Sequence, residues 1–267
     1  MIKLINLFFK GIIIGIAKII PGLSGSVLAI SFGIYEEALG RISKIFKNFK
    51  NNVYYLSILV LGIVLGIIIG AFIIKYLIFN MYYMTMFLFA GLIVGITIKF
   101  DFKINSNIKK IFLILLSIMF TFLILKNNYS VNEFVYENNL LNNVYTFFIG
   151  IIDAFSTIVP GISGTAIFIS LGVYDFVLKL FSFDMLISSA FIYFFLGILF
   201  GIIIISLIMN YLFTHYKKIT YNIIYILCVS SIFMMIFKID YSSMNFIYAI
   251  SSFFSFIMGI FISKSIS

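Results

Sequence analysis

Two short sequences in this chain combine the residue types that bind an anion. Residues 21–25 read Pro-Gly-Leu-Ser-Gly, and residues 160–164 read Pro-Gly-Ile-Ser-Gly. Proline lacks a backbone N–H and disfavours helix at the residue before it, so each sequence predicts a break between two helical arms. Glycine permits a positive φ, and serine caps the helix that follows. The N–H groups at such a helix start, with hydroxyls beside them, predict a phosphate site.

The two breaks are equivalent positions of an internal repeat. Residues 160–174 match residues 21–35 at an offset of 160 − 21 = 139, with eight of fifteen positions identical, and Pro21 and Pro160 are the two prolines of the chain. Repeats of this kind are sought before any other feature because they determine the fold. The alternative is a pair of kinks that serve only helix packing. The expected phosphate-binding residues are Lys18, Gly22, Ser24, Gly25, Ser26, Gly161, Ser163, Gly164 and Thr165.

The composition requires a membrane around these motifs. Hydrophobic residues make up 63% of the 267 residues and charged residues 10%, whereas a soluble domain is about half apolar and about a quarter charged. This excludes a soluble enzyme, a secreted domain and a disordered chain. A single Cys and a single His exclude a multi-Cys or His-rich metal centre. No P-loop indicates a nucleotide, and basic loops between apolar spans explain the net charge of +9 without a nucleic acid.

Six apolar stretches are long enough to cross a bilayer, which takes roughly 20 helical residues. Two further apolar stretches, 4–40 and 145–180, are each interrupted by Pro-Gly, which leaves halves of roughly 16 residues, too short for a hydrocarbon core of about 30 Å. We therefore predict two re-entrant helical hairpins, with two short complete crossings as the alternative. The six predicted crossings lie at about 53–76, 82–99, 109–126, 186–211, 219–237 and 245–263.

The basic residues predict the orientation. Lys and Arg gather in the loops 41–50, 99–110 and 211–219 and near both termini, so the positive-inside rule places these segments in the cytoplasm. Three crossings separate the two hairpins, so the second unit is inverted relative to the first. The prediction is an all-α polytopic membrane protein with an inverted-topology repeat, in which residues 1–126 and 145–267 are the two units and 127–144 is an extracytoplasmic connector.

Charged residues within or beside the hairpins are further candidates. Lys18 lies one helical turn before Pro21 and is placed to neutralise a phosphate, whereas Asp153 lies two turns before Pro160 and is placed to relay a proton or to pair with a base. Snorkelling to an interface or structural pairing is the alternative for both. Arg41 follows the first hairpin and is expected at the membrane surface, where it pairs or attracts an anionic headgroup.

Residues 10–36, KGIIIGIAKIIPGLSGSVLAISFGIYE, resemble the signature of the bacterial polyprenyl-phosphate transporter family, the PopT type, formerly a domain of unknown function. Ser26-Val27 departs from the Gly-Thr usual there, and Lys18 stands where a polar, often Asn-like residue is expected. The residues that fit the two family motifs are Pro21, Gly22, Ser24, Gly25, Gly33, Tyr35 and Glu36, then Pro160, Gly161, Ser163, Gly164, Gly172 and Tyr174.

The resemblance implies a transporter rather than an enzyme. Its substrate would be undecaprenyl phosphate, a carrier of cell-envelope sugar precursors, returned across the bacterial cytoplasmic membrane. We expect no covalent chemistry, cofactor or metal, and Asp153 indicates a proton or sodium ion as the coupling ion. A small-anion channel or exchanger is the first alternative, because helix starts also bind small anions. An intramembrane lipid-phosphate enzyme is the second, although no Ser has a His or Asp partner at a recognisable spacing.

Overall fold

The computed structural model describes residues 2–20, 24–101, 107–126, 134–182, 184–185, 187–237 and 239–265. Over these residues the chain forms helices and no strand, which confirms the all-α prediction. The helices are α1 (Ile2–Ile19), α2 (Gly25–Ser31), α3 (Tyr35–Ser43), α4 (Phe49–Asn80), α5 (Tyr82–Asp101), α6 (Asn107–Lys126), α7 (Leu140–Ile158), α8 (Gly164–Ser170), α9 (Tyr174–Leu180), α10 (Ser189–His215), α11 (Lys217–Phe237) and α12 (Phe246–Ser265).

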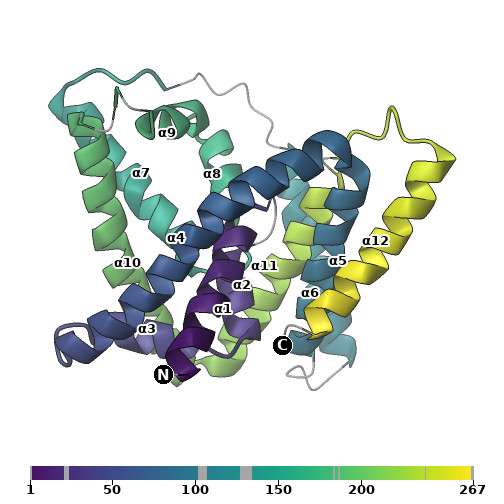
Figure 1. Cartoon of the computed structure of the whole chain (residues 1–267), viewed down its shortest axis with the longest axis horizontal. Coiled ribbons are helices and arrows are strands. Elements are labelled where there is room, and N and C mark those ends of the chain that lie inside the picture. Colours follow the sequence, from purple (N-terminus) through teal and green to yellow (C-terminus); the bar gives the residue numbers. More distant parts are fainter. Residues whose placement is uncertain are drawn as a thin grey trace.

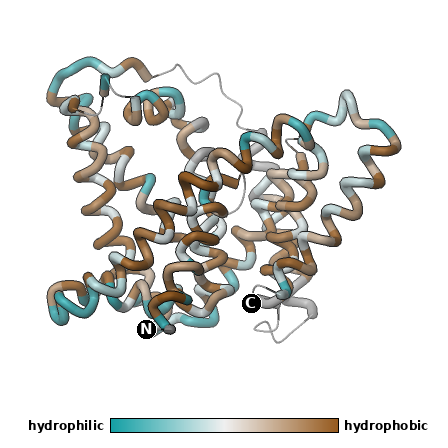
Figure 2. Tube along the Cα trace, viewed as in Figure 1, coloured by the Kyte–Doolittle hydropathy of each residue, from teal (hydrophilic) through white to brown (hydrophobic). Residues whose placement is uncertain are grey.

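Several of these helices have the length and composition of membrane spans. Among the described residues five qualify, namely α4, α7, α10, α11 and α12, and α5 contains a shorter apolar stretch at Tyr82–Ile98. Figure 2 shows hydrophobic residues along the helices and hydrophilic residues mainly at their ends. Large side chains such as Phe72 and Phe79 are 76% and 88% exposed, as expected of a surface that faces lipid. The chain is therefore a polytopic membrane protein.

Glycines bring the long helices into backbone contact in two equivalent pairs. A Cβ placed on Gly11 of α1 would lie 3.1 Å from the Cα of Gly62 on α4. A Cβ placed on Gly197 of α10 would likewise lie 3.1 Å from the Cα of Gly150 on α7. Small residues allow helix backbones to approach closely where lipid provides no hydrophobic driving force. Gly62/Gly66 and Gly197/Gly201 have the small-xxx-small spacing that such packing requires.

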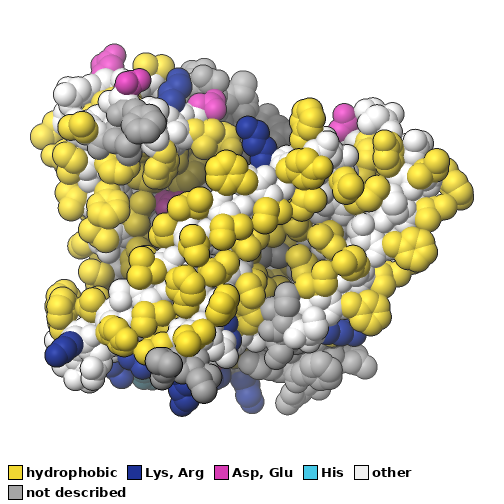
Figure 3. Space-filling model, in the orientation of Figure 1, with side chains coloured by type: hydrophobic (Ala, Val, Ile, Leu, Met, Phe, Trp, Pro, Cys, Tyr) yellow, Lys and Arg dark blue, Asp and Glu magenta, His cyan; other side chains and the backbone are white. Residues whose placement is uncertain are grey.

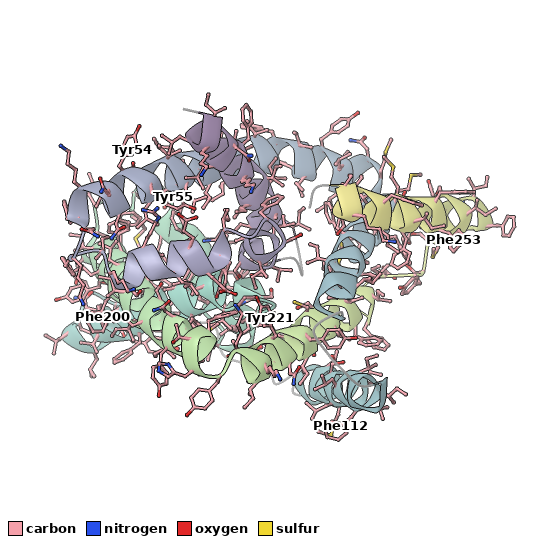
Figure 4. The ribbon with its side chains drawn as sticks, turned by 90° about the horizontal axis from the view of Figure 1, so that it is seen from below. Tyr54, Tyr55, Phe112, Phe200, Tyr221 and Phe253 are labelled. Atoms are coloured by element: carbon pink, nitrogen blue, oxygen red, sulfur yellow. The ribbon has the colours of Figure 1, made fainter. Side chains whose placement is uncertain are left out.

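The remaining helices form a second group beside these pairs. On α5, a Cβ at Gly91 would lie 3.1 Å from the Cα of Phe256 of α12. On α11, the Ser230 hydroxyl donates to the Ser117 carbonyl of α6 over 3.2 Å. Helices α5 and α11 also contact each other. Figure 4 shows Phe112 on α6 and Phe253 on α12 at the periphery, so these two helices flank the α5–α11 contact.

The two hairpins differ from the prediction of two equal halves. Their first arms are longer, because α1 has 18 residues and α7 has 19. Their second arms are shorter, because α2 and α8 have seven residues each, or about 10 Å of helix. A helix this short does not cross a bilayer by itself, which favours re-entrant hairpins over two complete crossings, and the choice between them stays a prediction. The expectation of roughly 16 residues per half is wrong.

Glycine ends both second arms early. Gly33 and Gly172 have φ values of 71° and 67°. The Ile34 N–H bonds to the Ala29 carbonyl over 3.1 Å, and the Val173 N–H bonds to the Phe168 carbonyl over 3.0 Å. These are the bonds of a Schellman motif, which terminates a helix at a residue of positive φ. The chain then turns into α3 and α9, which explains why each apolar run continues past the end of its helix.

The two hairpins open toward opposite ends of the molecule. Figure 1 shows α3 at the lower end, near the N-terminus, and α9 at the upper end. Figure 3 shows Lys and Arg side chains mainly at the lower end of this face and acidic side chains at the upper end. Which end meets the cytoplasm, and the division into units 1–126 and 145–267, stay predictions; α7 begins at Leu140, within the stretch predicted as connector.

Candidate functional site

The ends of the two first arms lie in contact with each other. The Lys18 ammonium, in the last turn of α1, donates to the Thr157 hydroxyl, in the last turn of α7, over 3.1 Å. The two residues are 157 − 18 = 139 positions apart, which equals the offset of the repeat. Lys18 and Thr157 are therefore equivalent positions that meet where each arm ends, although Thr157 was not among the predicted residues. The side chain of Lys18 is nevertheless exposed, so there is open space beside this contact.

The break after α7 is fixed against α11. Val159 leaves the helix with φ −74° and ψ 119°, Pro160 is buried, and Gly161 adopts φ 83°. A Cβ on Gly161 would lie 2.8 Å from the backbone nitrogen of Cys228, so only glycine fits here. The Ser231 hydroxyl of α11 donates to the Gly161 carbonyl over 2.8 Å. This contact was missed in the sequence, because nothing in the spacing of Ser231 relates it to the motif.

The break after α1 is described from Ser24 onward, so the predictions for Pro21 and Gly22 lie outside the described residues. Ser24 is the N-cap residue of α2, with φ −94° and ψ 129°, yet its side chain makes no capping bond. Its hydroxyl instead shares a hydrogen bond of 2.6 Å with the Ser26 hydroxyl. The prediction of a Ser24 cap is therefore wrong, and two hydroxyls stand together at the start of α2.

The start of α8 lies beside polar side chains of α7. A Cβ on Gly164 would lie 3.9 Å from Oδ1 of Asp153 and 3.2 Å from Cβ of Ser156. The Ser156 hydroxyl donates to the Asp153 carbonyl over 2.9 Å. Asp153 lies one helical turn before Thr157, the residue to which the Lys18 ammonium donates. The structure thus brings Asp153, predicted as a relay or pairing group, beside the start of α8 at the second break. The Thr165 side chain lies outside the described part, and Ser163 precedes α8 directly.

The start of α2 has an apolar counterpart of this environment. A Cβ on Gly25 would lie 3.1 Å from the Cγ2 methyl group of Ile14. Ile14 is equivalent to Asp153, because 14 + 139 = 153, and Ala17 is equivalent to Ser156. Asp153 and Ser156 therefore have no polar equivalents on α1, whereas Thr157 corresponds to Lys18.

Helix α3 connects the first hairpin to the end of α7. The Tyr35 hydroxyl donates to the Ile158 carbonyl over 2.7 Å. This carbonyl belongs to the last turn of α7, where the intrahelical partners run out. Burial raises the pKa of the Tyr35 hydroxyl, which therefore stays protonated and remains a donor. The Tyr35 ring also packs edge-on against Phe213 of α10, with 5.5 Å between ring centroids.

Arg41 lies away from the two breaks. Its guanidinium bonds to the Glu37 carboxylate on the same helix over 2.8 and 3.0 Å, and its Cζ lies 4.2 Å from the centroid of the Tyr55 ring of α4. On the other side of α3, Glu36 accepts from Lys217 and Tyr221 of α11, each over 2.9 Å. Figure 4 shows Tyr55 and Tyr221 on opposite sides of α3. Arg41 thus helps hold α3 to α4 and does not reach the candidate site.

The helices define a polytopic membrane protein, and the polar contacts join the ends of α1 and α7 at a candidate site. A family model described as VCA0040-like, undecaprenyl phosphate translocase-like, matches residues 14–249. The chain belongs to this family, which confirms the resemblance to polyprenyl-phosphate transporters. No curated protein and no solved structure matches the chain.

Proposed function

We propose that the protein is a flippase that moves undecaprenyl phosphate, or a similar polyprenyl phosphate, across the bacterial cytoplasmic membrane for recycling of the carrier lipid. The observation that carries the proposal is the contact between Lys18 and Thr157, which joins the ends of the two first arms. Substrate sites near the midplane, between broken helices of two repeats, are typical of transporters. Family membership supports the polyprenyl phosphate as substrate.

Lys18 is the group to which we assign the phosphate charge. A phosphate monoester carries about −1.5 to −2 charges at pH 7, and an ammonium beside hydroxyls supplies charge-assisted hydrogen bonds. Thr157, which already bonds to Lys18, is one neighbouring donor, and we assign the hydroxyls of Ser24, Ser26 and Ser163 to the same phosphate. Because α2 and α8 have only seven residues each, we give the helix ends a smaller part than the lysine.

The isoprenoid tail would stay among apolar side chains while the headgroup crosses. A cavity of about 220 Å³ opens beside the end of α7 and is lined by residues of α7, α10 and α11. Phe155 and Val159 of α7 contribute to it, next to the break at Pro160. The hairpins open toward opposite ends, which supports movement of the headgroup by rocking one unit against the other. Both termini lie in the cytoplasm in this proposal. No bond of the lipid is broken.

The test is transport by the purified protein in proteoliposomes that contain undecaprenyl phosphate. Lipid phosphate in the outer leaflet is measured by its accessibility to a phosphatase that does not cross the membrane. We expect the wild type to redistribute the lipid between leaflets, and Lys18→Met and the double variant Ser24→Leu/Ser163→Leu to lose most of this movement. Ser57→Leu, an exposed position on α4, is the matched control and should transport as the wild type does.

Each alternative has its own outcome in the same vesicles. Flux of inorganic phosphate or chloride without lipid would show a small-anion channel or exchanger. Release of inorganic phosphate from the lipid by the protein alone would show an intramembrane enzyme. Lipid movement in the Ser24→Leu/Ser163→Leu variant at the wild-type rate would overturn the assignment of the site.

A further inference from the structure

The short helices α3 and α9 occupy equivalent positions in the two hairpins but pack against different parts of the molecule. Tyr35 of α3 belongs to a hydrophobic core that contains residues of both predicted units, including Phe213 of α10. Phe176 and Leu180 of α9 belong to a separate core, whose described buried residues all lie between 149 and 194. Helix α3 thus packs against the second unit, whereas α9 packs within its own unit.

The polar contacts of α3 also cross from the first unit to the second. The Tyr35 hydroxyl donates to the Ile158 carbonyl of α7 over 2.7 Å, and the Glu36 carboxylate accepts from the Lys217 ammonium of α11 over 2.9 Å. Ile158 directly follows Thr157 of the candidate site. At this end of the molecule, α3 therefore joins the two units beside the site.

The equivalent residues of the second hairpin do not make the same contact. Tyr174 is equivalent to Tyr35, because 35 + 139 = 174, and Ile19 is equivalent to Ile158, because 19 + 139 = 158. The Tyr174 hydroxyl makes no hydrogen bond within the described part of the chain. Ile19 ends α1, where the last carbonyls have no partner within the helix. Figure 1 shows α9 at the upper end, away from α4, and Figure 3 shows a hollow below it.

We infer, on the basis of the proposed function, that α3 and α9 are two gates of the headgroup path, and that the α3 gate is shut and the α9 gate open in this structure. Two units of opposite orientation can exchange conformations, which opens the site on one side and shuts it on the other. In the other state, α3 leaves Ile158, α9 moves onto α4 and α5, and the Tyr174 hydroxyl donates to the Ile19 carbonyl. The two gate tyrosines thus hold the ends of α7 and α1 in turn, beside Thr157 and Lys18. In the predicted orientation, the open gate accepts the lipid from the outer leaflet.

Paired cysteines test the two gates. All pairs are placed in a Cys228→Ala protein, because Cys228 is the one cysteine of the chain. The first pair, Glu36→Cys/Lys217→Cys, joins α3 to α11 where the structure shows an ion pair. The second pair, Asp175→Cys/Tyr82→Cys, joins the equivalent positions of α9 and α5, because 36 + 139 = 175 and the repeat continues at an offset of 135, with 82 + 135 = 217. A short bis-thiosulfonate reagent, which dithiothreitol removes, bridges each pair.

The bridging rates and the transport of the bridged proteins have stated expectations. Without lipid, the first pair should be bridged readily and the second pair far more slowly, because only the α3 gate is shut. Either bridge should stop the movement of undecaprenyl phosphate in proteoliposomes, and dithiothreitol should restore it. Lys75→Cys/Phe79→Cys is the control, because both residues are exposed on α4 and a bridge between them joins no two helices.

Removal of a single hydroxyl tests the tyrosines themselves. Tyr35→Phe deprives the shut α3 gate of a buried hydrogen bond, so it should raise the rate at which the second pair is bridged by about tenfold. Tyr174→Phe removes a bond that forms only in the other state, so it should lower the same rate. A purely structural role of Tyr35 would change the melting temperature and leave the bridging rate as it is.

The outcomes separate this inference from the proposed function. A wild-type protein that moves no lipid overturns the proposed function, whereas the bridging rates still test the gates because they need no transport. Lipid movement that continues with the first pair bridged overturns the gates alone. Equal bridging of the two pairs without lipid does the same. If the first pair prevents folding, the rate at the second pair with and without Tyr35→Phe decides, and an unchanged rate overturns the inference.

Discussion

The two first arms, α1 and α7, pack in the same way but carry different chemistry. Each lies against a long helix, α4 or α10, through a glycine-to-glycine contact in which a Cβ would lie 3.1 Å from the facing Cα. Toward the break, however, α1 presents Ile14 where α7 presents Asp153. The two copies thus share their backbone packing but differ in the side chain that each first arm presents beside its break.

The short helices α3 and α9 differ in what holds them. Helix α3 is bound by Tyr35 to the end of α7 and by Glu36 to α11. Helix α9 is instead covered by the segment before α7: the Phe134 N–H bonds to the Gly172 carbonyl over 3.0 Å, and the Tyr136 ring stacks on Phe176 with 5.5 Å between centroids. Helix α3 is thus held by helices of the bundle, whereas α9 is held by Phe134 and Tyr136 in the segment before α7. The difference shows that repeat-related elements need not share partners.

Substitution of the packing glycines should have the largest effect, and an equal one in both repeats. Gly62→Leu and Gly197→Leu place a side chain where the facing backbone lies, so we expect each to cost about 3 kcal/mol or more. Thermal unfolding in detergent is monitored through the loss of the monodisperse chromatographic peak on heating. Val60→Leu, at an exposed position on α4, is the control. Unequal losses would show that the two arm pairs are not packed equivalently.

Removal of a tyrosine hydroxyl should destabilise the protein more in the first repeat than in the second. Tyr35→Phe leaves the Ile158 carbonyl without its buried donor, which costs about 1–3 kcal/mol. Tyr174→Phe changes the equivalent residue, which is less buried, and should cost less. Melting temperatures of the two variants make the comparison. A larger loss for Tyr174→Phe would contradict the role given to Tyr35.

Substitution of the glycines that end α2 and α8 should destabilise the two repeats to a similar extent. Gly33→Ala and Gly172→Ala force a Cβ into φ values of 71° and 67°, which costs about 1–2 kcal/mol each. Because no atom lies within 4 Å of a Cβ at Gly33, the cost there comes from the backbone alone. Melting temperatures measure both variants. An unchanged value for Gly33→Ala would mean that the Schellman turn does not require glycine.

Loss of the ion pair at α3 should have the smallest effect. Lys217 and Glu36 approach to 2.9 Å, but both side chains are about half exposed, so the pair is worth about 0–1 kcal/mol. We expect Glu36→Gln to lower the melting temperature slightly at low salt and hardly at all in 1 M salt, since roughly 1 M salt screens such charges. Asp175→Asn, the equivalent change on α9, is the control. A loss that persists at high salt would assign the contribution of Glu36 to its hydrogen bond with Tyr221.

Local residue types determined where most helices lie in the sequence and where several of them end. Long apolar runs identified the helices because apolar side chains and satisfied backbones are required in lipid, and the runs expected at 53–76 and 219–237 correspond to α4 and α11. Pro160 marked a real helix end for the same local reason, the missing N–H. The lengths of α2 and α8 were also encoded locally, in Gly33 and Gly172, but these glycines were assigned only to a family motif.

Only the tertiary structure decided which groups meet at the breaks. Lys18 bonds to Thr157, which is 139 positions away in the sequence, and Ser231 bonds to Gly161, which is 70 positions away. Such contacts depend on where whole helices lie, and that placement comes from the close approach of glycine backbones across α1–α4 and α7–α10. Periodicity and composition describe one helix at a time, so they identify a charged residue in a span but not the partner that faces it.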